Sequence, residues 1–218
     1  MKKQYPEYCI WDFNGTILND VETGIASVNC LLAERGLPLI ESVEHYRRVF
    51  RFPIKGYYER LGFDFQREPY EVIAPLWVAE YLRRVPAAPL YEDVRETLER
   101  FRRAGVRQVV LSATEREMLL TQLRSLELLD YFEEVMGLDN IHAASKLSLA
   151  EDFCARHPHA SAIFLGDTDH DLETARALGA ECYLISRGHQ SEEYLKTFGA
   201  PVFESLSKFY NETFGVSR

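Results

Sequence analysis

The sequence has no long apolar run, few cysteines and no excess of positive charge, and each absence excludes a class of protein. No stretch is long enough for the apolar region of a signal peptide or for a membrane span, so we expect a cytoplasmic protein. The cysteines stand far apart, form no CxxC pair and have no histidine at zinc spacing, which is typical of reduced thiols. They are Cys9, Cys30, Cys154 and Cys182.

The charge of the chain is acidic overall, with a formal net value of −9. This argues against a nucleic-acid backbone or an anionic membrane as the main partner. A small anion is still compatible with this charge, because a local site can supply cations and backbone N–H groups. Apolar residues make up 46% and charged residues 27% of the 218 positions, so the chain can bury a sizeable core, as one large domain or as a core with a modest insertion.

The order of the expected elements divides the chain into two parts. Residues 8–13 form a short, largely apolar segment that favours a strand. After it, apolar residues recur at three- and four-residue spacing, which predicts a helix capped by Asn19 or Asp20. Helical character continues in pieces to about Val85, and apolar strand-like runs are absent from this part of the sequence.

Beyond the Pro86–Pro89 segment, which we interpret as a hinge, strand and helix patterns alternate. The expected strands cover residues 109–111, 135–136, 162–165 and 182–185, and the expected helices cover 94–104, 115–126, 146–156 and 171–178. Strands that alternate with helices indicate an α/β fold with a parallel sheet covered on both faces. Ligands of such folds bind at the carboxyl ends of the strands. No GxGxxG follows the first strand, so an ordinary dinucleotide-binding protein is poorly supported.

Asp12 stands at the end of the first expected strand. A carboxylate there is costly to bury unless it is paired, hydrogen-bonded or bound to a metal. The Asn14-Gly15 pair that follows is also a strong two-residue signal for a β-hairpin turn. Against a hairpin, residues 16–18 are few and lead directly into a helix. A functional carboxylate and a hairpin turn are therefore both open at this point.

Two further polar residues stand next to expected helices. Ser112 follows the strand 109–111, and either it or Thr114 can cap the next helix. The free N–H groups of such a strand-to-helix turn can also hold a phosphate. Lys146 opens the expected helix 146–156. Most lysines are solvated surface charges, but the helix dipole slightly disfavours a cation at this end of a helix, which suggests another purpose.

Three aspartates occur within five residues, soon after the expected strand 162–165. They are Asp167, Asp169 and Asp171. Their charges repel one another unless a cation or a helix cap neutralises them. Capping by Asp169 or Asp171 is one interpretation. The other, which we favour, is a Mg²⁺ site, because this hard cation prefers carboxylate oxygens.

Taken in order, these segments resemble the four sequence motifs of the haloacid dehalogenase superfamily. Asp12-Phe13-Asn14-Gly15-Thr16 is similar to its nucleophile motif, Ser112 to its hydroxyl motif, Lys146 to its lysine motif, and Gly166-Asp167 to Asp171 to its acidic motif. Residues 171–180 also resemble the corresponding helix of phosphoglycolate phosphatase-like members. The resemblance covers nearly the whole chain, and it is specific for the superfamily rather than for a substrate.

The resemblance implies a Rossmann-like α/β core with a small helical cap inserted after the first strand. The core would comprise residues 1–18 and 86–218, and the cap would comprise residues 19–85. The resemblance further implies a Mg²⁺-dependent hydrolase. We expect a phosphatase that acts on a small phosphorylated metabolite and has no nucleic-acid or membrane partner.

The implied mechanism begins with attack of the Asp12 carboxylate on phosphorus, which forms an aspartyl-phosphate that water then hydrolyses. In this family Asp12, Asp167 and the backbone carbonyl of Asn14 would hold Mg²⁺, which offsets the repulsion between two anions. Asp171 would complete the metal site, or orient Lys146 or a metal-bound water. The transferring oxygens would be bound by Ser112, Lys146 and the N–H groups near Ala113 and Gly15.

Asn14 departs from the family pattern. In the family's phosphatases the residue two positions after the nucleophile is usually an aspartate that protonates the leaving oxygen. Asparagine cannot exchange a proton at neutral pH, and the loss of general acid–base help typically costs roughly 10²–10⁴ in rate. Three explanations are open: a leaving group that needs little protonation, such as an acyl or aryl phosphate; a proton from another group; or a binding or regulatory protein without turnover.

The expected cap carries the remaining candidates. Arg47, Arg51 and Lys55 have enough positive charge to hold an anionic substrate tail, and a solvated helix face explains them equally well. Lys55 also lies in about the region where the superfamily's carbon–phosphorus hydrolases carry a Schiff-base lysine, although a surface lysine is the simpler interpretation. The sequence does not indicate the roles of Asp169 and His170, the natural substrate or the oligomeric state.

Overall fold

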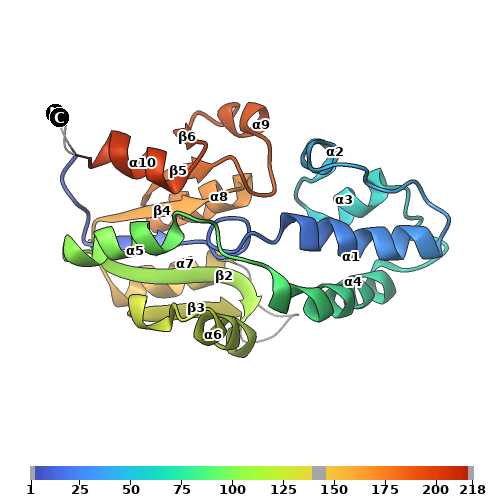
Figure 1. The fold of residues 1–218 in the computed structure, drawn as a ribbon, viewed down its shortest axis with the longest axis horizontal. Helices are drawn as coiled ribbons and strands as arrows, with labels where there is room; N and C mark the ends of the chain where they lie inside the picture. Colours follow the sequence, from blue (N-terminus) through green and yellow to red (C-terminus); the bar gives the residue numbers. More distant parts are fainter. Residues whose placement is uncertain (1–2, 139–145, 216–218) are drawn as a thin grey trace.

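The computed structural model describes residues 3–138 and 146–215. Its centre is a six-stranded parallel sheet in the order β3-β2-β1-β4-β5-β6 (Figure 1). The strands are β1 (Tyr8–Trp11), β2 (Arg107–Glu115), β3 (Glu134–Leu138), β4 (Ala162–Gly166), β5 (Glu181–Ile185) and β6 (Val202–Phe203). The alternating pattern of the sequence predicts this α/β arrangement, and the prediction is confirmed.

Strand β1 lies inside the sheet, between β2 and β4. Ile10 pairs with Val109 on one side and with Phe164 on the other, in parallel in both cases. Every side chain of β1 is buried, as expected for a strand covered on both faces. Because both neighbours of β1 are parallel, the chain does not fold back after Asp12, and the hairpin interpretation of Asn14-Gly15 is wrong.

Helices cover both faces of the sheet, and the alternating side chains of each strand decide which cluster they join. Trp11 packs with Phe101 and Phe209 in one apolar cluster, whereas Ile10 packs with Phe153 and Leu172 in another. The helices around the sheet are α5 (Val94–Arg103), α6 (Arg116–Ser125), α7 (Lys146–Arg156), α8 (Asp169–Leu178), α9 (Glu192–Lys196) and α10 (Leu206–Thr213). The short 3₁₀ turns are η1 (Val85–Ala87) and η2 (Leu129–Tyr131).

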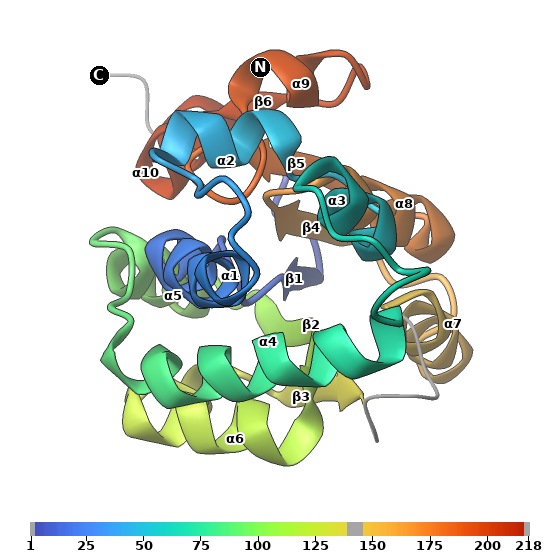
Figure 2. The same cartoon turned by 90° about the vertical axis from the view of Figure 1, so that its right-hand side faces the viewer.

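Four helices between β1 and η1 form a separate layer beyond the carboxyl ends of the strands (Figures 1 and 2). They are α1 (Val21–Glu34), α2 (Val43–Val49), α3 (Ile54–Arg60) and α4 (Tyr70–Arg84). They share an apolar cluster of their own, which includes Leu32, Tyr57 and Ile73, with Phe50 and Trp77 packed against it. This layer therefore has its own core and lies over the sheet edge at which ligands of α/β folds bind.

The caps of two helices differ from the expectation, although the helices themselves lie within two residues of where the sequence predicts them. Strand β2 continues to Glu115, so Ser112 and Thr114 lie within the strand. The carboxylate of Glu115 caps α6 by accepting the N–H groups of Glu117 and Met118, and the interpretation of Ser112 or Thr114 as the cap is wrong. Helix α8 is capped by Thr168, with Asp171 as the reciprocal partner in a capping box. The last elements, β6, α9 and α10, were outside the sequence prediction.

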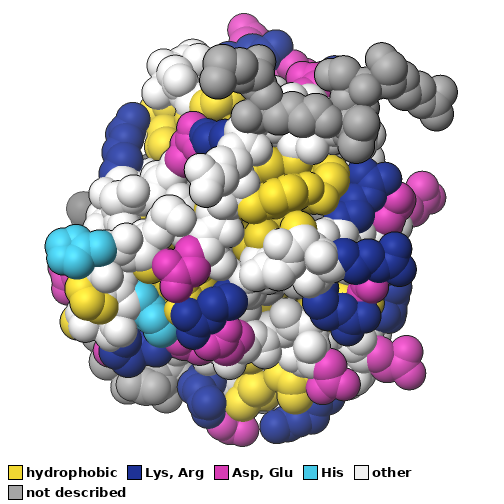
Figure 3. Space-filling view, turned by 90° about the vertical axis from the view of Figure 1, so that its left-hand side faces the viewer, with side chains coloured by type: hydrophobic (Ala, Val, Ile, Leu, Met, Phe, Trp, Pro, Cys, Tyr) yellow, Lys and Arg dark blue, Asp and Glu magenta, His cyan; other side chains and the backbone are white. Residues whose placement is uncertain are grey.

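The side of the molecule that faces away from α1–α4 carries acidic and basic side chains intermixed, with apolar side chains between them (Figure 3). No large field of one sign is visible on that face. Among the described helices none is long and apolar enough to cross a membrane.

Candidate active site

The acidic side chains of two neighbouring strands meet at the carboxyl edge of the sheet. Asp12 follows β1 and Asp167 follows β4, and these strands pair directly, with Trp11 opposite Leu165. One carboxylate oxygen from each of Asp12, Asp167 and Asp171 lies within 4.8 Å of the others. All three side chains are at most 3% exposed. Clustered carboxylate oxygens are the donor set that a hard divalent cation such as Mg²⁺ prefers, so these residues fit such an ion.

Lys146, at the start of α7, lies inside this acidic cluster rather than in solvent. It is 6% exposed, and its ammonium group contacts Oδ1 of Asp12 and donates to Oδ1 of Asp171 at 2.7 Å. A buried cation of this kind is stable only when it is paired. We call these four residues, Asp12, Lys146, Asp167 and Asp171, the charged cluster.

Burial and the ammonium of Lys146 act in opposite directions on the pKa values within the charged cluster. Burial raises the pKa of Asp12 well above its usual range, although the ammonium of Lys146 opposes this. Burial also raises the pKa of Asp167, to about 6, against the opposing effect of His189. Burial alone would raise the pKa of Asp171 as well, but Lys146 and local hydrogen bonds hold it below the ordinary value. A divalent cation would favour the charged form of all three carboxylates.

Asp171 is fixed by its surroundings. Its Oδ2 accepts the backbone N–H groups of Asp167 and Thr168, each at 3.0 Å, and the Thr168 hydroxyl at 2.7 Å. Gly166 permits this approach, because a Cβ at that position would lie 2.4 Å from Cβ of Asp171. With Oδ2 saturated and Oδ1 on Lys146, Asp171 is arranged to hold the lysine and the loop after β4.

The side chain of Asn14 lies between three segments of the chain. Its amide nitrogen donates to Oδ2 of Asp20 at 3.0 Å and to the hydroxyl of Tyr81 at 2.8 Å. Its amide oxygen accepts the hydroxyl of Thr114 at 2.9 Å, and the Ser112 hydroxyl lies at 3.5 Å. The Asn14 side chain therefore connects the loop after β1 with β2 and with α4.

Ser112, Ala113 and Gly15, the residues that the resemblance implies bind phosphate, lie near the end of β2 and in the loop after β1. Ser112 is buried near the end of β2, and its hydroxyl accepts the N–H of Thr114 at 3.1 Å, while Ala113 is exposed. Gly15 has φ +75°, and a Cβ there would lie 2.3 Å from Oδ2 of Asp167, so only glycine fits between the two strand ends.

Asp20 is a site residue that the sequence reasoning misjudged. It occupies the N-cap position of α1, but its side chain makes no capping hydrogen bond. Instead Oδ1 accepts the N–H of Gly15 at 2.8 Å, and Oδ2 accepts the Tyr81 hydroxyl at 2.6 Å. The carboxylate is only 2% exposed.

His189 is the functional candidate that the sequence reasoning missed. Its backbone N–H donates to Oδ2 of Asp167 at 2.6 Å, its Nδ1 lies 2.9 Å from the Tyr46 hydroxyl, and its Nε2 lies 3.4 Å from Oδ1 of Asp20. Burial would lower the pKa of His189, but the two carboxylates raise it to about 9, so the imidazole is positively charged at neutral pH. His189 lies shortly after β5, at the same edge of the sheet as the charged cluster. A titratable residue that follows a predicted strand is the sequence feature that indicates such a candidate.

The cationic candidates of the helical layer make contacts within the protein. The guanidinium of Arg47 donates to the backbone oxygen of Gly188 at 2.8 Å, and that of Arg51 lies 3.5 Å from the centre of the Tyr194 ring. The ammonium of Lys55 lies 5.4 Å from the ring centre of Phe65, within the layer itself. Arg47 thus joins α2 to the loop after β5, and Arg51 joins the segment after α2 to α9.

Asp169 and His170, whose roles the sequence left open, have partners outside the charged cluster. Asp169 accepts the Tyr194 hydroxyl at 3.0 Å and the Gln190 amide at 2.8 Å. The ring of His170 lies 5.0 Å from that of Phe52. These contacts tie α8 to α9 and to the helical layer.

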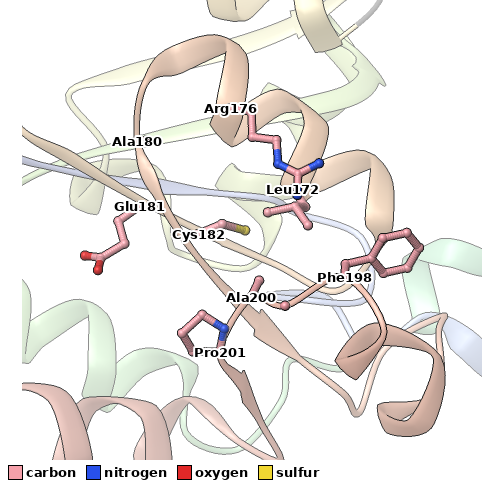
Figure 4. A pocket seen from close by; sticks show the side chains of 9 residues that line it. Leu172, Arg176, Ala180, Glu181, Cys182, Phe198, Ala200 and Pro201 are labelled. Atoms are coloured by element: carbon pink, nitrogen blue, oxygen red, sulfur yellow. The ribbon is translucent and has the colours of Figure 1, made fainter.

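Neither of two surface cavities is lined by the charged cluster. One, of about 200 Å³, is lined by Arg176, Glu181 and Cys182 and lies at the amino end of β5, between α8 and the segment before β6 (Figure 4). Burial raises the pKa of the Cys182 thiol, so this residue is no ready nucleophile. The other, of about 520 Å³, lies between η1 and α6 and is largely apolar. The candidate site is thus defined by its enclosed polar groups rather than by a large cavity.

Comparison with known proteins agrees with this geometry. Residues 9–185 match the family model of the haloacid dehalogenase-like hydrolases. The phosphoglycolate phosphatase of Pseudomonas savastanoi pv. phaseolicola is 24% identical over 194 residues, which cover 84% of this chain and 71% of that protein.

Solved structures share the fold at lower identity. A haloacid dehalogenase-like hydrolase from Streptococcus pneumoniae has a TM-score of 0.78 at 17% identity and covers 95% of this chain and 98% of its own. Protein tyrosine kinase A from Mycobacterium tuberculosis has a TM-score of 0.80 at 20% identity, with 97% and 100% covered. Since these names differ in activity, the fold alone does not decide the reaction, and the site must.

Proposed function

We propose that this chain, which belongs to the haloacid dehalogenase-like hydrolase family, is a Mg²⁺-dependent phosphatase acting on a small phosphorylated metabolite. The observation that carries the proposal is the charged cluster. It combines a buried carboxylate at the end of the central strand, two further aspartates and a buried lysine. Such a combination can bind a divalent cation and the oxygens of a phosphoryl group side by side.

Asp12 is the nucleophile in this proposal. One of its carboxylate oxygens attacks phosphorus while the bond to the leaving oxygen breaks, and the leaving oxygen takes a proton from water because Asn14 has none to give. A second water then hydrolyses the aspartyl-phosphate, which releases phosphate and regenerates the carboxylate. Lys146, which contacts Oδ1 of Asp12, orients the nucleophile and stabilises negative charge on the transferring oxygens. A Mg²⁺ ion held by Asp12, Asp167 and the backbone carbonyl of Asn14 would supply further charge compensation.

The remaining groups bind and orient. In this proposal Ser112 and the N–H groups near Ala113, at the end of β2, hold phosphoryl oxygens, whereas the N–H of Gly15 already donates to Asp20 and Gly15 serves by leaving room beside Asp167. Asp171 holds Lys146 through Oδ1 and the loop after β4 through Oδ2, so we assign it the role of orienting the lysine.

We further propose that residues 19–85 act as a cap, with residues 1–18 and 86–218 as the core. Two features support this division: helices α1–α4 share their own apolar cluster, and several of their contacts with the core involve polar groups. A cap over the strand ends would exclude water during the reaction and open for product release. Arg47, Arg51 and Lys55 then serve mainly to hold the cap together and against the core.

The name of the relatives suggests where to begin with substrates. The Pseudomonas relative is a phosphoglycolate phosphatase, and a small phosphorylated acid carries two anionic groups. The charged imidazole of His189 beside the cluster offers such a substrate a second cation. Phosphoglycolate is therefore the first metabolite to test.

Turnover and its dependence on Asp12 test the proposal. Para-nitrophenyl phosphate and phosphoglycolate are incubated with Mg²⁺ and the protein, its Asp12→Asn variant, or the control Asp152→Asn, which changes an exposed carboxylate paired with Arg156. We expect Asp12→Asn to lower kcat/KM by on the order of 10⁴ or more, and the control to stay within about twofold. Turnover that survives Asp12→Asn would refute the assignment.

A binding or regulatory protein is the second candidate, and the asparagine at position 14 is the observation that favours it. It predicts that phosphate and Mg²⁺ raise the melting temperature while a broad set of phosphorylated metabolites is left intact. The two candidates therefore differ in turnover and agree in ligand binding.

A further inference from the structure

We infer that Asn14 is a positioning residue whose amide is required by Asp20 and Tyr81, so that the site is built around asparagine rather than impaired by it. The catalytic part of this inference rests on the proposed function. Its structural part, the hydrogen-bonded unit of Asn14, Asp20 and Tyr81, which we call the amide cluster, stands on the geometry alone.

The hydrogen-bond directions in the amide cluster fix the residue type at position 14. A phenol hydroxyl has one hydrogen, and Tyr81 donates it to Oδ2 of Asp20 at 2.6 Å. Toward Asn14, 2.8 Å away, the same hydroxyl can therefore only accept. An ionised Asp20 also only accepts, and its Oδ2 lies 3.0 Å from the Asn14 nitrogen. Position 14 must thus supply a hydrogen toward these two acceptors, which an amide does and an ionised carboxylate cannot.

Asp20 is held so that it cannot turn away from position 14. Its Oδ1 accepts the N–H of Gly15 at 2.8 Å and faces Nε2 of His189 at 3.4 Å. The carboxylate is 2% exposed, so water cannot take the place of these partners. An aspartate at position 14 would therefore place a half-buried carboxylate about 3.0 Å from the buried carboxylate of Asp20 with no hydrogen between them, and the two like charges would repel.

The amide oxygen of Asn14 connects the amide cluster with Thr114 and Ser112, near the end of β2. It accepts the hydroxyl of Thr114 at 2.9 Å, and Thr114 in turn lies 3.1 Å from the Ser112 hydroxyl. Tyr81 belongs to α4 of the proposed cap, with its ring stacked on Trp77 at 4.9 Å between ring centres. Asn14 thus links the position of the cap to the loop that carries Asp12 and to the serine that would bind phosphoryl oxygens.

An exchange of the two groups tests the amide cluster. The set consists of the parent protein, Asn14→Asp, Asp20→Asn and the double variant that carries both changes. In the double variant the amide at position 20 can donate to Tyr81 and to the carboxylate at position 14, so the number of hydrogen bonds is restored. In the absence of Mg²⁺ and substrate, we expect Asn14→Asp to lower Tm by roughly 5 °C or more, and the double variant to recover at least half of that loss.

Activity is measured on the same set with para-nitrophenyl phosphate and Mg²⁺. We expect Asn14→Asp to lower kcat by about tenfold or more with a smaller change in KM, because the hydroxyls that grip the transferring oxygens lose their orientation. The double variant should recover most of this loss. An increase in kcat for Asn14→Asp at unchanged Tm, or a double variant no better than Asn14→Asp in either measurement, overturns the inference.

Tyr81→Phe decides the case if Asn14→Asp and the double variant both fail to fold. This change removes one hydroxyl and keeps the ring stacked on Trp77. A fall in kcat of about threefold or more supports the inference, and unchanged kcat and Tm overturn it. If the parent protein hydrolyses nothing, the proposed function fails, while the Tm values of the set still decide whether the amide cluster exists.

Discussion

The charged cluster and the amide cluster meet at the loop after β1. They differ in whether the protein itself supplies enough partners, in charge or in hydrogen bonds, for the polar groups of the cluster. The charged cluster opposes three buried carboxylates with one ammonium and is short of positive charge. In the amide cluster the Asn14 amide nitrogen faces two acceptors within the chain, and the hydrogen of the Tyr81 hydroxyl meets Oδ2 of Asp20. The first arrangement suits binding and chemistry, and the second suits holding one geometry.

The difference has an energetic side. Asp12, Asp167 and Lys146 gain from charge neutralisation, which changes with metal, phosphate and pH. Asn14 and Tyr81 are neutral, and His189 and local hydrogen bonds lower the pKa of Asp20 despite its burial, so Asp20 stays charged near neutral pH. The contribution of the amide cluster therefore depends mainly on matching donors with acceptors. Removal of a charged side chain or of the metal should therefore disrupt the charged cluster and leave the amide cluster largely intact.

Removal of the buried ammonium of Lys146 should have the largest effect on stability and activity, and it should act on the charged cluster. Lys146→Met leaves Asp12 and Asp171 without their partner, and breaking a buried ion pair typically costs about 3–5 kcal/mol. We expect Tm to fall by about 10 °C and kcat/KM with para-nitrophenyl phosphate to fall by on the order of 10²–10³. Lys55→Met, which changes an exposed lysine, is the matched control and should change both values little. A variant at Lys146 that keeps its activity within about threefold contradicts the assigned role.

Metal addition should have the next largest effect. Saturating Mg²⁺, near 100 times its Kd, should stabilise the parent protein by about 2.7 kcal/mol and raise Tm by roughly 5–10 °C, and removal by EDTA should reverse this. Asp167→Asn should lose most of the Tm increase, because one carboxylate of the cluster is gone. Asp169→Asn should keep it, since Asp169 is bound by Tyr194 and Gln190 instead. Equal Tm increases in both variants would place the ion elsewhere.

The pH dependence of stability that His189 causes should be the smallest effect. His189 contacts both clusters, through Asp167 of the charged cluster and Asp20 of the amide cluster. Burial lowers its pKa, but Asp20 and Asp167 raise it from 6.5 in the unfolded chain to about 9. The stability from the charged form is therefore fully present below pH 6.5 and is lost as pH rises through 9. In EDTA, the parent protein should lose roughly 2 kcal/mol, or about 5 °C in Tm, between pH 7 and 9.5.

The comparison with a variant isolates the histidine in that pH profile. His189→Gln should show a flatter decline of Tm between pH 7 and 9.5, because glutamine does not titrate. His45→Gln, in α2, should behave like the parent protein. Identical slopes for all three proteins would show that the imidazole is neutral in the folded state.

The sequence predicted the parallel sheet because its strands are short apolar runs that alternate with helices, and β4 and β5 lie within a residue of where the apolar pattern places them. It also predicted that Asp12 and Asp167 meet, since the carboxyl ends of parallel strands share one edge. The short β6 escaped prediction, because a two-residue strand at the sheet edge leaves no periodic pattern.

The sequence by itself determined that acidic groups at the strand ends gather at one edge of the sheet, because strand polarity and apolar periodicity are properties of short segments. Only the tertiary structure decided what Asn14 and Asp20 do. Their partners Tyr81, Thr114 and His189 are 61 to 169 positions away in sequence from the residues they contact. From the neighbouring sequence alone, Asp20 is predicted to cap a helix, and Asn14 is interpreted as the loss of a general acid. A hydrogen bond needs a donor and an acceptor that the fold brings together, and a local sequence pattern contains only one of the two.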